Sequence, residues 1–156
     1  MKKNFLVVIL VALVSVFAYA GNDNNQNTKE SQNTEWKLLT EKNGVKIYFK
    51  YENCSDEVND IHQENVVLKV VNTTNQNIIV EWDTELWYND NCRTCNMKNG
   101  ENHNKIELNA GETKIGSCEK RHQLRELVIF SKFTKYQNKV NLTKFQLNNV
   151  VVNVRN

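Results

Sequence analysis

Two cysteines at C-x-x-C spacing are the residues of this chain whose types and separation point most directly to chemistry. Cys92 and Cys95 have the spacing of a redox-active dithiol, of half a zinc site or of a small disulfide loop. A redox dithiol places its first thiol at a helix N-terminus, where the helix dipole lowers the thiol pKa. The asparagine-rich sequence around the pair is typical of a turn, and the chain has no proline to supply the cis-proline found beside thioredoxin-type sites. The sequence therefore offers little support for a redox site.

A metal site is the second chemistry that these cysteines could support. It would combine the C-x-x-C pair with Cys118 and with either Cys54 or a histidine such as His103 or His122. Structural zinc sites use two pairs of closely spaced ligands, and Cys118 has no cysteine or histidine two or three residues away. We therefore expect no metal and no cofactor. A small metal- or redox-handling protein that uses the C-x-x-C pair, Cys118 and His122 is kept as the alternative.

The first 20 residues have the layout of a secretory signal peptide. A short basic start precedes an apolar run over residues 5–17 and an A-x-A site that ends at Ala20. We expect cleavage after Ala20, a disordered polar tether over residues 21–34 and one folded domain over residues 35–156. The mature protein would be secreted or periplasmic, in a bacterium, with no membrane span left after cleavage.

The composition excludes several classes of protein. Hydrophobic residues make up 40% and charged residues 24% of the chain, which suits a globular domain and excludes both a fully disordered chain and a multi-span membrane protein. When Lys2 and Lys3 leave with the signal, the 20 basic residues become 18 and match the 18 acidic ones. A protein that binds nucleic acid through a strong positive field is therefore not expected.

Two disulfides are the expected state of the four cysteines in an oxidising compartment. A crosslink would restrain the long polar insertion over residues 96–105 by lowering the entropy of the unfolded chain. We pair Cys118 with one member of the C-x-x-C pair and Cys54 with the other. A Cys54–Cys118 bond together with a local Cys92–Cys95 bond remains a close alternative.

Carboxylates at alternate positions are the remaining candidates for catalysis. Glu81, Asp83 and Glu85 alternate with apolar residues, at a spacing within the range of glycosidase carboxylates. A solvated strand face is the simpler interpretation, because catalysis would also need a cleft. The sequence contains no nucleophile elbow, H-E-x-x-H motif, Walker loop or dinucleotide fingerprint. We therefore expect no catalytic residues and no enzyme.

Trp87 and Tyr88 are the candidate ligand-binding residues. If the apolar residues at positions 78, 80, 82 and 86 face the core, Trp87 points outward and Tyr88 follows at the strand end. Exposed aromatic platforms can stack on sugar rings or peptides. The alternative is that Trp87 packs under the long loop after Cys95.

These side chains must be positioned by strands, because the apolar residues after Trp36 recur with a period of two. The segment over residues 66–71 is apolar on both faces and is a candidate central strand, whereas the segment over residues 78–86 is half-buried. Further strands are predicted at residues 45–51, 106–108, 113–116, 127–133 and 142–154. A phase slip at Asn148-Asn149 indicates a bulge.

Turn-forming residues connect the predicted strands. Residues 72–77 are expected to close a hairpin, and residues 109–112 to return residues 113–116 after the strand at 106–108. A helical turn is considered only over residues 119–127. Seven or eight short strands with at most a short helical turn indicate an all-β, antiparallel β-sandwich.

In the order and composition of its predicted strands, the chain resembles the immunoglobulin-like domains of secreted bacterial proteins. The resemblance rests on the strand over residues 66–72, the strand over residues 78–87, the segment over residues 106–112 and the valine-rich last strand. It implies a fold without an activity, and the chain lacks the cysteine pair that brackets a tryptophan in antibody-type domains. We expect a non-catalytic binding or structural module of the cell envelope, with a protein or a glycan as its partner.

Overall fold

The structure is a computed structural model that describes residues 35–95, 97, 100–118, 124–135 and 140–155. These residues belong to one compact unit, and the signal peptide and tether expected over residues 1–34 lie outside the described part. No helix in the described part is long and apolar enough to cross a membrane. The described elements are β1 (Lys37–Lys42), β2 (Val45–Asp56), β3 (Ile61–Asn72), β4 (Ile78–Tyr88), β5 (Asn91–Cys92), β6 (His103–Leu108), β7 (Thr113–Ile115), the 3-10 turn η1 (Arg125–Leu127), β8 (Val128–Phe133) and β9 (Leu142–Val154).

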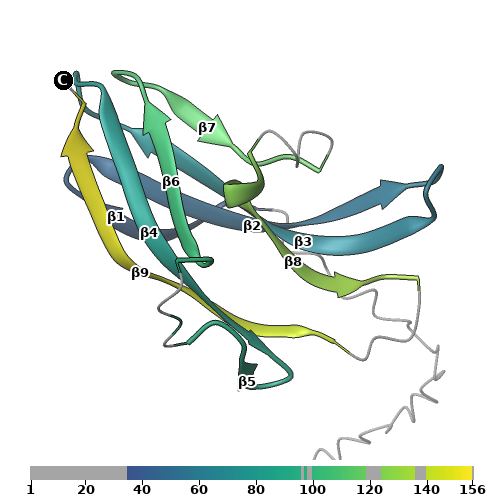
Figure 1. The fold of residues 1–156 in the computed structure, drawn as a ribbon. Coiled ribbons are helices and arrows are strands. Elements are labelled where there is room, and N and C mark those ends of the chain that lie inside the picture. The colour runs from purple at the N-terminus through teal and green to yellow at the C-terminus, as the bar shows by residue number, and fades with distance from the viewer. Residues whose placement is uncertain (1–34, 96, 98–99, 119–123, 136–139, 156) are drawn as a thin grey trace, which may run out of the picture. The chain divides into compact units, whose positions relative to one another are not determined.

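Sheet A is built around β3, the strand that is apolar on both faces (Figure 1). β2 pairs with β3 along its whole length, and β1 pairs with the outer edge of β2. Along the other edge of β3, β8 pairs with Gln63–Val67 and β7 with Lys69–Val71. The sheet is curled like a half-barrel. The predicted central strand is therefore confirmed.

Sheet B is built in the same way around β4. β9 pairs with β4 from Ile78 to Tyr88 on one edge, and β6 and β5 pair in succession with the other edge. β5 ends at Cys92, opposite Trp87, and β6 begins at His103, opposite Asp83, so the edge of β4 between them has no strand partner among the described residues. This gap in the ladder lies beside the candidate site.

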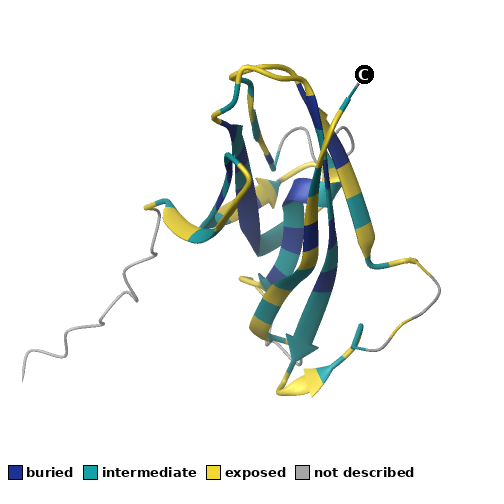
Figure 2. Ribbon diagram, turned by 90° about the vertical axis from the view of Figure 1, so that its left-hand side faces the viewer, coloured by how far each residue is buried: buried dark blue, intermediate teal, exposed yellow. Residues whose placement is uncertain are grey.

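The hydrophobic core lies between the two sheets. Trp82, Leu68 and Leu108 are among the fully buried side chains, and Leu127 of η1 joins them. Along β4, buried residues alternate with partly buried ones from Ile78 to Glu85, and Figure 2 colours these two classes dark blue and teal. All strands are antiparallel, so the predicted all-β class and the period-two pattern are confirmed.

The described part contains nine strands, whereas seven or eight were expected and seven were located from the alternation of apolar residues. The additional strands are β1 and the two-residue β5. Each belongs to a tight hairpin whose two loop residues have positive φ, Asn43-Gly44 before β2 and Asn89-Asp90 before β5. Such loops match the right-handed twist of the flanking strands, which favours Asn-Gly and similar pairs.

Two predicted hairpins are wrong. The turn over residues 72–77 leads from β3 in sheet A to β4 in sheet B, and the turn over residues 109–112 leads from β6 in sheet B to β7 in sheet A. Asn72 holds both crossings, because its buried amide donates hydrogen bonds to the carbonyls of Gln76 and Asn109, each at 2.8 Å. The same polar residues that favour hairpins thus connect the two layers here.

The predicted bulge in the last strand is confirmed. Asn149 and Val150 of β9 lie opposite the single residue Trp82, and Asn149 has φ +52°. The extra residue shifts the alternation by one, so Leu147 and Val150 both pack toward the core. The predicted helical turn is present as the 3-10 turn over Arg125–Leu127, while residues 119–123 lie outside the described part.

Candidate functional site

The four cysteines form two disulfides, Cys54–Cys118 and Cys92–Cys95, with Cα–Cα distances of 5.4 Å and 5.6 Å. The preferred pairing of Cys118 with the C-x-x-C pair is therefore wrong, and the close alternative is correct. Cys118 follows β7 on the way to η1, and it reaches Cys54 of β2 in the same sheet. Cys118 is therefore unavailable to a site built on the C-x-x-C pair.

The alternative metal site is not assembled in the structure, because all three of its cysteines are in disulfide bonds. His122, its fourth residue, lies outside the described part. His103 instead contacts Asp83, with Nδ1 3.0 Å from Oδ1. No cluster of three or more histidine, cysteine or acidic side chains in the described part could hold a metal ion.

The acidic residues of β4 lie on the outer face of sheet B, as the strand-face interpretation predicts. Glu81 faces Lys105 at 3.7 Å, and Asp83 lies between His103 and Asn149. Hydrogen bonds from Asn149 and then from His103 lower the pKa of Asp83. The carboxylates therefore take part in a polar network on the surface of the sheet.

Trp87 and Tyr88 do not form a joint platform. The ammonium of Lys144 lies 4.3 Å from the centre of the Trp87 ring, on the face that carries the acidic residues. Tyr88 follows the opposite alternation, and its hydroxyl donates to the carbonyl of Phe130 at 2.8 Å. Burial raises the pKa of Tyr88. Consecutive residues of a strand point to opposite faces, which is why the two aromatic rings separate.

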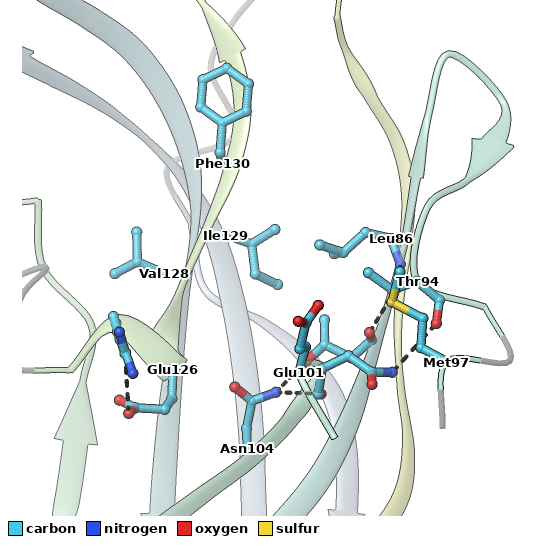
Figure 3. A pocket seen from close by; sticks show the side chains of 12 residues that line it. Leu86, Thr94, Met97, Glu101, Asn104, Glu126, Val128, Ile129 and Phe130 are labelled. Carbon is cyan, nitrogen blue, oxygen red and sulfur yellow. Dashed lines mark hydrogen bonds and ion pairs between the residues drawn. The ribbon is translucent and has the colours of Figure 1, made fainter. Parts of the chain in front are cut away.

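A cleft of about 340 Å³ opens beside the edge of β4 that lacks a strand partner among the described residues (Figure 3). One side comes from β4, β6 and the segment between β5 and β6, and the other side comes from η1 and β8. The cleft therefore lies between sheet A and sheet B. The lining residues are Thr84, Leu86, Thr94, Met97, Glu101, Asn102, Asn104, Arg125, Glu126, Val128, Ile129 and Phe130.

Polar side chains on the sheet B side of the cleft are held by hydrogen bonds to one another. The Thr84 hydroxyl accepts hydrogen bonds from Trp82 Nε1 at 3.1 Å and from Asn104 Nδ2 at 2.9 Å. The Thr94 hydroxyl donates to the carbonyl of Thr84 and accepts from the N–H of Leu86, both at 2.9 Å. These partners therefore fix the positions of the polar groups on this side of the cleft.

Apolar side chains and charged residues complete the cleft. Ile129 and Leu86 approach from opposite sides in Figure 3, while Glu126 and Arg125 come from η1. The Arg125 side chain is 85% exposed, whereas that of Glu126 is 32% exposed, and their charged atoms are 4.0 Å apart. Glu101 adds a second carboxylate from the other side. The cleft thus combines apolar walls with two carboxylates and one cation.

Sequence reasoning did not identify the cleft. Thr84 was a possible signal, because it is a polar residue at a core-facing position of the strand over residues 78–86. The opposite wall, over residues 125–130, is nearly 40 residues further along the chain, and nothing in its alternation indicates a neighbour in sheet B. Comparisons of the chain with protein-family models, with curated proteins and with solved structures found no match.

Proposed function

We propose that this chain is an exported, non-catalytic binding module of the cell envelope, secreted or periplasmic, and that its ligand site is the cleft. Two disulfides indicate an oxidising compartment, since such bonds are rare in proteins of the cytosol. The signal-like residues 1–20 support the same location. The domain is proposed to be a variant of the immunoglobulin-like sandwich, a proposal supported by two antiparallel sheets on either side of one core that contains Trp82.

The cleft is the observation that carries the proposal. Its volume lies in the range of sites for small molecules, and it combines apolar walls with a few fixed polar groups. Both threonine hydroxyls in its lining are engaged by neighbouring backbone or side-chain groups. Neither is held against a general base, so their geometry supports recognition of a ligand and not nucleophilic attack.

The charges at the cleft indicate which ligands it favours. Among the described residues that line the cleft, Glu101 and Glu126 are acidic and Arg125 is basic, and the Arg125 side chain is 85% exposed whereas that of Glu126 is 32% exposed. Ile129 and Leu86 offer apolar contacts beside these carboxylates. We therefore propose a ligand with a short apolar stem and a cationic end, such as the side chain of a lysine presented by an envelope protein.

Probes of equal length and different charge test this proposal. We expect hexylammonium to shift the NMR methyl signals of Leu86 and Ile129 at lower concentration than hexanol, and hexanoate to bind least. Glucosamine has an amine but no apolar stem. Binding of hexylammonium at lower concentration than glucosamine would favour a lysine side chain over an amino sugar as the ligand. Equal effects of all probes, or shifts confined to residues outside the cleft, would contradict the proposal.

Matched variants assign the effect to the charged residue. Glu126→Gln removes one carboxylate of the cleft and keeps the shape of the side chain, so it should weaken hexylammonium binding several-fold and leave hexanol binding unchanged. Glu81→Gln removes a carboxylate from the outer face of sheet B and serves as the control. A similar loss in both variants would indicate that only the overall charge of the protein matters.

A further inference from the structure

Thr94 takes the place of a missing strand at the edge of β4. Between the end of β5 and the start of β6, the backbone groups Thr84 C=O and Leu86 N–H both bond to the Thr94 hydroxyl at 2.9 Å. The next group along this edge, the carbonyl of Leu86, accepts from the N–H of Arg93 at 2.8 Å. One side chain therefore closes the gap in the ladder and also lines the cleft.

The Cys92–Cys95 disulfide holds Thr94 in this position. The bond closes a loop with a sequence separation of 3, and Thr94 is inside that loop. Apart from the disulfide, Thr94 is tied to its surroundings mainly through its hydroxyl, because the bonds to its carbonyl from the Met97 N–H and from Asn102 Nδ2 are long, at 3.4 Å and 3.5 Å. Both cysteines are partly exposed, so a reductant in solution can reach them.

We propose that the Cys92–Cys95 disulfide is a redox-sensitive clamp that sets the shape of the cleft. When a dithiol reductant opens the bond, Thr94 leaves the edge of β4 and the cleft loses part of its wall. The inference rests on the proposed function only in treating the cleft as the ligand site. The change in structure at Thr94 can be observed without any ligand.

The reaction is an ordinary thiol–disulfide exchange. A thiolate of the reductant attacks Cys95 Sγ and forms a mixed disulfide, while Cys92 leaves as a thiolate that takes up a proton. The second thiol of the reductant then displaces Cys95, so two electrons and two protons pass to the cysteines and the reductant leaves as its cyclic disulfide. Cys92 is the better leaving group because the N–H of Cys95 points at its sulfur, at 3.0 Å.

The second disulfide differs in the burial of one of its cysteines and in the length of the loop that it closes. Cys54 is only 7% exposed, and the bond to Cys118 has a sequence separation of 64. Cys118 is partly exposed, but the Cys54 sulfur lies against the buried side chain of Asn65, which donates a hydrogen bond to it. Because one of its sulfurs is buried and its loop is long, we expect Cys54–Cys118 to open after Cys92–Cys95, and it serves as an internal reference for the proposed clamp.

Stepwise reduction of the oxidised protein with dithiothreitol tests the order of opening. Thiols are trapped with N-ethylmaleimide at each step and located by peptide mapping. We expect Cys92 and Cys95 to be labelled while Cys54 and Cys118 remain bonded. Opening of Cys54–Cys118 first, or of both bonds together, would overturn the proposal.

Amide hydrogen exchange of Leu86 reports whether the clamp opens. Its N–H donates to the Thr94 hydroxyl, so selective reduction should speed its exchange by about fivefold to tenfold, the effect of losing roughly one hydrogen bond. Exchange at Val80, in the paired part of β4, should not change. Unchanged exchange at Leu86 after selective reduction would refute the clamp.

Three variants distinguish the effect of the disulfide from the effect of the Thr94 hydroxyl on amide exchange at Leu86. Thr94→Val keeps the disulfide and removes the hydroxyl, so exchange at Leu86 should be fast in the oxidised protein, whereas Thr94→Ser should keep it slow. A Cys92→Ser/Cys95→Ser variant should behave like the reduced protein, and selective reduction of the wild type answers the same question if that variant does not fold. Hexylammonium titration of the oxidised protein is independent of these results, so the ligand and the clamp can fail separately.

Discussion

Asn149 donates a hydrogen bond to the Asp83 carboxylate at 2.8 Å from the bulge of β9, so the residue that shifts the register of the strand also stabilises a charge on its neighbour. This bond is the largest cause of the lowered pKa of Asp83, followed by the bond from His103. The ordinary pKa of this carboxyl group is 3.8. The contribution of Asp83 to stability is therefore fully present above pH 3.8 and is lost as the pH falls through the lower pKa of the folded state.

Asp83→Asn should reduce the free energy of unfolding at pH 7 by about 1 kcal/mol, because it removes charge-assisted hydrogen bonds. As the pH falls below 3.8 and through the lower pKa of the folded state, the wild-type carboxylate is protonated as well, so the difference should shrink. Urea unfolding at a series of pH values from 7 downward measures the difference. Glu85→Gln, on the same face of β4, is the control and should change little. A difference that stays constant across pH would contradict the assignment.

Asn72→Ala should destabilise the fold by about 1–3 kcal/mol, the cost of leaving buried partners unsatisfied. Asn72 is fully buried, donates to two carbonyls and accepts from the backbone N–H and hydroxyl of Thr74. Asn75→Ala changes an exposed asparagine of the same turn and should have almost no effect. Thermal and urea unfolding of the two variants make the comparison, and equal losses would show that Asn72 is not the anchor of the crossings.

The two disulfides should differ in their contribution to stability. Loop-closure entropy predicts about 4 kcal/mol for Cys54–Cys118 and about 2 kcal/mol for the short Cys92–Cys95 loop. Double replacement of each pair by serine, followed by urea unfolding under non-reducing conditions, measures both values. A larger loss on removing the short loop would mean that the contacts of Thr94 outweigh the entropy of the unfolded chain.

Trp87 and Lys144 should be coupled by about 0.5–1 kcal/mol, the usual size of an exposed cation–π contact. A double-mutant cycle with Trp87→Ala and Lys144→Ala measures this energy by urea unfolding. Lys105→Ala combined with Trp87→Ala is the control and should be additive, since Lys105 contacts Glu81. No coupling between Trp87 and Lys144 would leave the ring free to contact a partner.

Tyr88→Phe should lower the free energy of unfolding by about 1 kcal/mol, because it removes the hydrogen bond to Phe130 that joins β4 to β8. Burial raises the pKa of Tyr88 above its ordinary 10.0, so the folded state retains the proton longer than the unfolded state. Stability should therefore fall as the pH rises above 10.0, and less steeply in the variant. Unfolding between pH 8 and pH 11 checks this, with Tyr48→Phe as the control.

The alternation of apolar residues was sufficient to predict the fold class and the faces of individual strands. Val67 and Val70 are both buried because β3 is central, and Asn149 marks the bulge where the phase slips. The Asn43-Gly44 pair could also have located β1, since this dipeptide strongly favours a two-residue hairpin. These features depend on interactions between residues that are close in the chain, so they can be inferred from the sequence alone.

The pairing of sheets was not predictable in this way. The turns after β3 and β6 have hairpin composition, yet both cross between layers, because the buried Asn72 amide joins them through contacts with Gln76 and Asn109. The cysteine pairing depends on the same long-range geometry. Cys118 meets Cys54 only because β7 and β2 lie on either side of β3.

The sequence by itself thus determined an all-β chain, the alternating faces of its longer strands, the bulge in its last strand and the C-x-x-C spacing. Only the tertiary structure decided which strands share a sheet, which cysteines are bonded and where the cleft lies. The physical reason is that alternation and turn chemistry act between residues close in the chain. The cleft depends on Thr84, Thr94 and Ile129, which approach one another only after two sheets have packed.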